Sequence, residues 1–101
     1  MKKILLCCSA GMSTSMLVKK MEQSAAQRGI ECKIEAQSVS SFNEVIADFD
    51  VCLLGPQVRF QLEELGKIAA EHGKNIAAIP AQDYGMMKGD VVLEQALSLI
   101  D

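Results

Sequence analysis

The sequence lacks tryptophan, has a single histidine and contains no long apolar run. Aromatic residues make up 4% of the 101 residues, the net charge is −3, and lysine and arginine form no cluster. A surface for nucleic acid is therefore not indicated. A helix that crosses a bilayer needs about 20 mostly apolar residues in a row. We expect neither a nucleic-acid partner nor direct insertion into a membrane.

Metal-ligand spacing is also missing. The chain has four cysteines, at Cys7, Cys8, Cys32 and Cys52. No two of them form a CxxC pair, so we expect no metal site. The apolar stretch near the N-terminus stops at Ser9, too short for a secretion signal. We therefore expect a cytoplasmic location, where thiols stay reduced. Three cysteines are then candidates for the core, and one for chemistry.

What the sequence has is an ordinary globular composition, with 50% hydrophobic and 23% charged residues. This length and composition predict one domain over residues 1–101 with a single core. The start at Met1 and the end near the last predicted helix favour a free subunit over part of a fused chain, and the free chain is expected to be a monomer. Short apolar runs alternate with longer amphipathic segments. The pattern predicts strands at 3–8, 31–37, 50–54 and 75–79, helices at 13–28, 40–47, 57–71 and 90–100, and a loop at 81–88.

This alternation predicts an α/β fold. The continuous apolar run 3–8 is typical of a central strand, and the alternating polarity of 31–37 is typical of an edge strand. We expect a four-stranded parallel sheet of order 2-1-3-4, flanked by helices on both faces. Such sheets bind ligands where the strand order reverses, at the carboxyl ends of the strands. The segments 8–15 and 55–57 are predicted to meet there.

Helical spacing predicts the inward faces of the helices. In 13–28 this face holds Met16, Leu17 and Met21, with Ser13 as N-cap and Gly29 as the C-terminal stop. Apolar residues that we expect on the inward faces of later helices are Phe42, Val45, Ile46, Phe60, Leu62, Leu65, Val91, Val92 and Leu93.

The predicted site begins with Cys8. A loop of small residues follows and leads into a helix, an arrangement that aims backbone N–H groups and a partial positive charge at an anion. We predict that this loop binds phosphate through Ser9, Ala10, Gly11, Met12, Ser13, Thr14 and Ser15. A helix N-terminus also favours a thiolate, which is a nucleophile toward phosphorus. Cys8 is the predicted nucleophile, whereas Cys7 points to the opposite face and is expected in the core. The alternative is that Cys8 only packs at a strand end.

The segments Leu6–Ser15 (LCCSAGMSTS) and Leu53–Gln57 (LLGPQ) resemble the IIB component of the bacterial sugar phosphotransferase system, lactose/chitobiose/cellobiose type. The resemblance covers essentially the whole chain. It implies that Cys8 accepts phosphate from a phosphohistidine IIA protein and transfers it to a sugar in the membrane IIC component. The sugar is expected to be a β-linked disaccharide such as cellobiose, chitobiose or lactose. The activity is that of a protein-phosphocysteine–sugar phosphotransferase, with a covalent phosphate and no cofactor.

The loop and the fold also resemble the low-molecular-weight tyrosine phosphatases, which carry Cys, five residues and then Arg. The arginine position is Thr14 here, and Asp83 is the one candidate for their general acid. Without a guanidinium to clamp the phosphoryl oxygens, hydrolysis should be slow, as a carrier requires. A thiol phosphatase, an arsenate-reductase-like enzyme and a non-catalytic anion-binding module remain as alternatives.

Three further residues are possible rim residues of the site: Gln57, Asp83 and Tyr84. Gln57 follows a strand end, so its amide is placed either to contact the phosphate or a partner or to cap the third helix. Tyr84 either borders the site or covers the edge of the core. His72 closes a helix at the opposite end of the sheet, and we expect no catalytic role for it.

Overall fold

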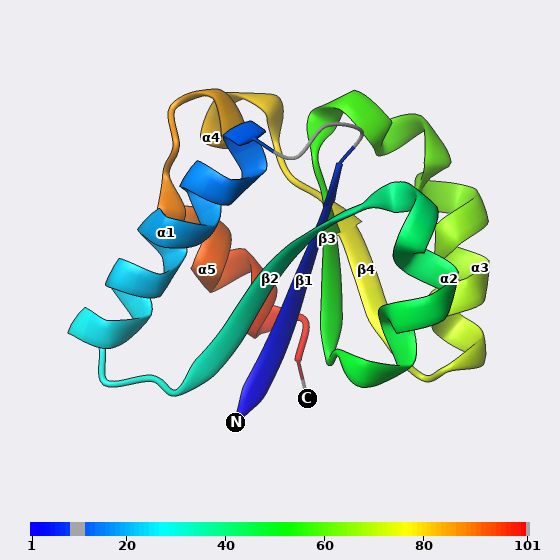
Figure 1. The fold of residues 1–101 in the computed structure, drawn as a ribbon, viewed down its shortest axis with the longest axis horizontal. Helices are drawn as coiled ribbons and strands as arrows, with labels where there is room; N and C mark the ends of the chain where they lie inside the picture. Colours follow the sequence, from blue (N-terminus) through cyan, green and yellow to red (C-terminus); the bar gives the residue numbers. More distant parts are fainter. Residues whose placement is uncertain (9–11, 101) are drawn as a thin grey trace.

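A four-stranded parallel sheet lies between two layers of helices in the computed structural model (Figure 1). The structure describes the backbone of residues 1–8 and 12–100 and the side chains of residues 1–8 and 14–100. The strands are β1 (Lys2–Cys8), β2 (Cys32–Ser38), β3 (Val51–Leu54) and β4 (Asn75–Ala78). Their order is β2-β1-β3-β4 and every pair is parallel, which confirms the predicted topology.

The two helical layers are unequal. Long helices cover one face, α1 (Met12–Gln27) and α5 (Gly89–Ser98), together with the short α4 (Ala81–Gly85). The other face is covered by α2 (Phe42–Val45), α3 (Leu62–Glu71) and three short 3₁₀ helices. These are η1 (Val39–Ser41), η2 (Ile46–Asp48) and η3 (Pro56–Gln61). Strand β1 is therefore covered on both sides, which explains its continuous apolar sequence.

Successive side chains of β1 enter two separate apolar clusters. Ile4 and Leu6 pack in the cluster beneath α1 and α5. Leu5 and Cys7 pack in the cluster beneath α2 and α3. Because side chains alternate along a strand, Cys8 shares the face of Ile4 and Leu6. The strand thus directs its last residue to the α1 side of the sheet.

The carboxyl ends of the strands lie at one edge of the sheet, and the two chain ends lie at the opposite edge (Figure 1). At the carboxyl edge the backbone N–H of Gly55 donates to the carbonyl of Cys7 over 2.8 Å. The end of β1 and the segment after β3 are therefore joined directly. This is the point where the strand order reverses, as the predicted topology requires.

Three predicted inward-facing residues are wrong: Met16 is 58% exposed, Phe60 78% and Val91 42%. In α1, Leu17 and Met21 fill the inward face, and the neighbouring Met16 lies outside that stripe. Phe60 lies in a 3₁₀ helix with a break at Val58 (φ −119°), which changes the phase of the side chains. In α5 the buried stripe is centred on Val92, Leu93 and Ala96, which leaves Val91 outside it.

Several element boundaries also differ from the prediction. The expected loop 81–88 contains α4, in which the N–H of Tyr84 donates to the carbonyl of Pro80 over 3.0 Å. The expected helices 57–71 and 40–47 are each divided into α-helical and 3₁₀ segments. Because α1 begins at Met12, Ser13 lies inside the helix and is not its N-cap. Gly29 has the expected left-handed conformation (φ 67°) after α1.

Over the described residues, no helix combines the length and the apolar character that crossing a bilayer requires.

Candidate functional site

Cys8 is the last residue of β1 and lies beside Ser38 of β2 in the strand register. Its exposure is 1%, so it is a buried residue, although it is a member of neither apolar cluster formed by the described residues. It is therefore a covered residue at the end of a central strand, at the reversal of strand order. The thiol is reduced, as are those of the other three cysteines.

The predicted phosphate loop is described only at its end. Ser9, Ala10 and Gly11 lie outside the described residues, as do the side chains of Met12 and Ser13. Their assignment as phosphate ligands stays a prediction. The helix that they were expected to precede is present, because α1 begins at Met12. Its first turn carries a partial positive charge and N–H groups without partners inside the helix.

The second predicted segment lies directly beside Cys8. A methyl group on the α-carbon of Gly55 would stand 3.4 Å from Cβ of Cys8 and 2.7 Å from Oε1 of Gln57. The side chain of Gln57 thus turns back over Gly55 toward the end of β1. Gln57 lies inside η3, and the residue that precedes α3 is Gln61, so Gln57 does not occupy the N-cap position of either helix. Of its two predicted roles, the position of Gln57 favours the one at the site.

Thr14, in the first turn of α1, is turned inward. It is 1% exposed, and its Oγ1 lies 2.9 Å from Oη of Tyr84, a buried hydrogen bond between two hydroxyls. The ring of Tyr84 packs in the cluster beneath α1 and α5. Tyr84 therefore covers the edge of the core while its hydroxyl reaches the helix that begins after Cys8. No local sequence signal connects these two residues, and sequence reasoning missed the contact.

The remaining rim candidate, Asp83, is half-buried in α4, and its backbone carbonyl accepts the N–H of Lys88 over 3.0 Å. His72 is exposed, and its Nδ1 lies 3.0 Å from the carbonyl of Ile68, at the end of α3. Its place at the amino edge of the sheet is the one expected. The structure thus brings Gln57 to Cys8, brings Tyr84 to Thr14, and keeps His72 away.

The other cysteines have different environments. The thiol of Cys52 donates to Sγ of Cys7 over 3.8 Å, and both side chains are fully buried. This hydrogen bond, together with burial, raises the pKa of Cys52 above its ordinary value. Burial also raises the pKa of Cys32, with a smaller contribution from Glu22. The core role predicted for Cys7 and Cys52 is confirmed, whereas Cys32 is only half-buried.

Within the described parts of the chain, no group of three histidine, cysteine, aspartate or glutamate residues is placed to hold a metal ion.

Residues 3–95 match the family described as the PTS system, lactose/cellobiose specific IIB subunit. The chain belongs to this family. It is 45% identical over 105 residues to the galactose-specific EIIB component of Lactococcus lactis subsp. cremoris and to the cellobiose-specific EIIB component of Lactococcus lactis subsp. lactis. Each match covers 99% of this IIB subunit and 97% of the relative. The oligo-beta-mannoside-specific EIIB component of Bacillus subtilis is 44% identical over 100 residues, with the same coverage.

Solved structures agree with this assignment. The solution structure of the cellobiose-specific IIB component from Borrelia burgdorferi has a TM-score of 0.82 and 43% identity, covering 98% of this chain and 91% of that one. The lactose-specific IIB domain from Streptococcus pneumoniae has a TM-score of 0.89, with coverage of 99% and 98%. Its identity is 19%, so it shows the shared fold alone. As a IIB subunit, the chain is a transferase component of a sugar phosphotransferase system.

Proposed function

We propose that this IIB subunit carries a phosphoryl group on Cys8, in the cytoplasm, from a phosphohistidine IIA protein to a sugar held by a membrane IIC component. One observation carries the proposal: Cys8 ends β1 at the reversal of strand order, next to Gly55 and Gln57 and four residues before α1. The chain leads from this cysteine into the first turn of a long helix, and a helix N-terminus stabilises an anion.

The proposed reaction has two steps. The Cys8 thiolate attacks the phosphorus, the S–P bond forms, and the N–P bond to the IIA histidine breaks with its electron pair left on the imidazole. A sugar hydroxyl then attacks the same phosphorus, the S–P bond breaks, and the hydroxyl proton is released while the thiolate is restored. Cys8 is 1% exposed, so the proposal requires that Cys8 becomes more accessible when either partner binds.

Between the two steps the phosphocysteine must resist water. Thr14 stands where a related phosphatase has arginine, and it is buried against Tyr84. The position therefore supplies no guanidinium to stabilise the transition state of hydrolysis. The backbone N–H groups of residues 9–15 are the proposed holders of the phosphoryl oxygens. This difference favours a carrier over a phosphatase or an arsenate-reductase-like enzyme.

The relatives named for galactose, cellobiose and oligo-beta-mannosides support a β-linked disaccharide or a related sugar as the final acceptor. In the proposed relay the IIC component binds the sugar. The IIB subunit supplies only the phosphoryl group, so its own site needs no sugar pocket.

The test reconstitutes the relay with phosphoenolpyruvate, the general carrier proteins and a IIA protein, and follows the intact mass of the chain. We expect one phosphoryl group to be added to the wild-type chain and to Cys7→Ser, but not to Cys8→Ser. A phosphorylated Cys8→Ser chain would show that another residue is the nucleophile.

A second assay follows p-nitrophenyl phosphate. We expect at most slow release of p-nitrophenol by the wild-type chain. Rapid, sustained release that disappears in Cys8→Ser would establish the phosphatase instead.

A further inference from the structure

The buried Thr14–Tyr84 contact joins two connections at the carboxyl edge of the sheet. Thr14 lies in the first turn of α1, which follows β1, and Tyr84 lies in α4, which follows β4. The two residues are 70 positions apart, and both are almost fully buried. A buried hydroxyl is costly without a partner, so each of these hydroxyls stabilises the position of the other.

Packing of the ring and backbone hydrogen bonds fix the position of Tyr84, although α4 has only five residues. Its ring packs in the apolar cluster beneath α1 and α5, and its backbone N–H donates to the carbonyl of Pro80. After it, the N–H of Met87 donates to the carbonyl of Tyr84 over 3.1 Å. The tyrosine hydroxyl therefore projects from a fixed ring onto the start of α1.

Thr14 in turn lies six residues after Cys8, within the first turn of the helix that follows β1. Cys8 points to the same side of the sheet as α1 and Tyr84. The position of that first turn relative to Cys8 sets where its N–H groups point. Phosphoryl transfer depends strongly on such placement, because donors must stand close to the oxygens on which charge develops.

We propose that Tyr84 is a positioning residue for phosphoryl transfer: through the hydroxyl of Thr14 it holds the first turn of α1 against the end of β1. This inference rests on the proposed function of Cys8. Tyr84 acts through Thr14 and through the helix, and it does not itself contact the phosphoryl group.

The test measures phosphoryl transfer from phosphorylated IIA to the wild-type chain, Tyr84→Phe, Thr14→Val and the double variant. With saturating IIA we expect the rate to fall about tenfold in each single variant, since a small misplacement of catalytic donors has effects of this order. The IIA concentration at half-saturation should stay unchanged. The double variant should be no slower than either single one, because both changes remove the same contact. Thr14→Ser keeps the hydroxyl and should restore most of the rate.

Ile34→Val is the matched control. Ile34 is buried in the same cluster as Tyr84 but lies on β2, where it pairs with Ile4. It should lower the melting temperature while leaving the transfer rate unchanged at temperatures where the chain is folded. Wild-type rates in folded Tyr84→Phe and Thr14→Val, or rates that fall equally in Ile34→Val, would overturn the proposal.

A second measurement separates this inference from the proposed function. Amide hydrogen exchange at residues 16–18 should become faster in Tyr84→Phe than in Ile34→Val, because the first turn of α1 loses its anchor. If wild-type Cys8 takes up no phosphate, the proposed function fails, and unchanged exchange in Tyr84→Phe would separately refute the anchoring role.

Discussion

Cys7 and Cys8 are neighbours on the same strand, yet their surroundings differ completely. Cys7 points into the cluster beneath α2 and α3, where the thiol of Cys52 donates to its sulfur. Cys8 points to the other face and belongs to neither apolar cluster. Gly55 and the folded-back side chain of Gln57 lie beside it. Two identical side chains, one position apart, thus occupy a closed core and the edge of a site.

The comparison shows that position on the sheet, more than residue type, determines the surroundings of each thiol. Alternation along the strand separates the two thiols, and the reversal of strand order gives only one of them a helix start and a strand end as neighbours. Substitutions on the Cys8 face and on the Cys7 face of the sheet should therefore have different effects.

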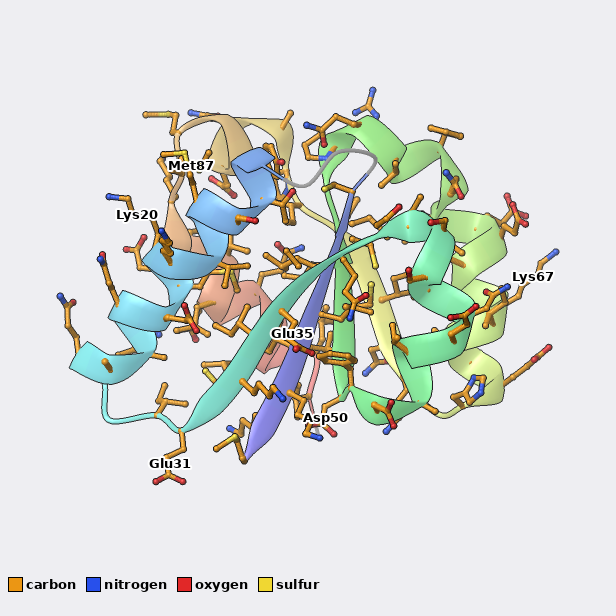
Figure 2. The ribbon with its side chains drawn as sticks, viewed as in Figure 1. Lys20, Glu31, Glu35, Asp50, Lys67 and Met87 are labelled. Atoms are coloured by element: carbon orange, nitrogen blue, oxygen red, sulfur yellow. The ribbon has the colours of Figure 1, made fainter. Side chains whose placement is uncertain are left out.

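The largest effect is expected at Gly89, where α5 approaches the backbone of α1 on the Cys8 face. A methyl group on the α-carbon of Gly89 would stand 2.5 Å from the backbone carbon of Lys20 and 2.8 Å from its carbonyl oxygen. Figure 2 shows Lys20 on α1 and Met87, just before α5, at the same end of this layer. Gly89→Ala must push α5 away from α1, so we expect the free energy of unfolding to fall by about 3 kcal/mol.

Gly66→Ala, in α3 on the Cys7 face, is the matched change. Its methyl group would stand 3.6 Å from Cγ2 of Ile76, an ordinary contact. Alanine favours the helix over glycine, so we expect a gain of about 0.5–1 kcal/mol. Urea unfolding of the two variants measures both values. Equal changes in the free energy of unfolding would mean that an added methyl group is accommodated equally well in the two helical layers.

A smaller difference is expected between serine substitutions of the two neighbouring cysteines. Cys7→Ser places a hydroxyl in an apolar cluster and should cost about 2 kcal/mol of unfolding free energy. Cys8→Ser places the same hydroxyl outside both clusters, and we expect a loss below about 1 kcal/mol. Thermal and urea unfolding at neutral pH compare the two. A greater loss in Cys8→Ser would show that Cys8 is the more tightly packed thiol.

The smallest effect concerns alkaline pH. The hydrogen bond to Cys7 and burial raise the pKa of Cys52 above the ordinary value of a thiol, so the folded state keeps a proton that the unfolded chain releases. The contribution of Cys52 to the free energy of unfolding is fully present below about pH 9 and decreases as the pH rises above that value. One such group accounts for about 1 kcal/mol between pH 9 and 10.

Comparing wild type with Cys52→Ala tests this contribution together with that of Cys7, because the hydrogen bond from Cys52 lowers the pKa of Cys7 and is lost in the variant. We expect a shallower decline of stability with pH in Cys52→Ala. Parallel curves for the two proteins would indicate that Cys52 titrates alike in the folded and unfolded states.

The order of the strands was predictable from local patterns. The unbroken apolar run of β1 and the alternation in β2 identify a central and an edge strand, and the strand order follows from them. The place of Cys8 beside Gly55 follows from that order. The motif residues also indicated the family that the comparisons then showed.

Features that depend on distant packing were not predictable. The prediction that Phe60 points inward was wrong, because a 3₁₀ segment with a break at Val58 carries no distinct sequence period. The helix α4 has five residues, too few to display a periodicity. The contact between Thr14 and Tyr84 joins residues 70 positions apart. The sequence contains many other polar groups that either hydroxyl could bond, so it does not identify this pair.

Both chain ends leave the sheet at its amino edge, away from Cys8 (Figure 1). An anchor attached at Met1, or a fluorescent label added beyond Ile100, is therefore displaced from Cys8 by the length of the strands. Tethering the chain by either end to a solid support keeps the opposite edge facing the solution. Binding of IIA and of membrane fragments to one oriented layer then becomes directly comparable.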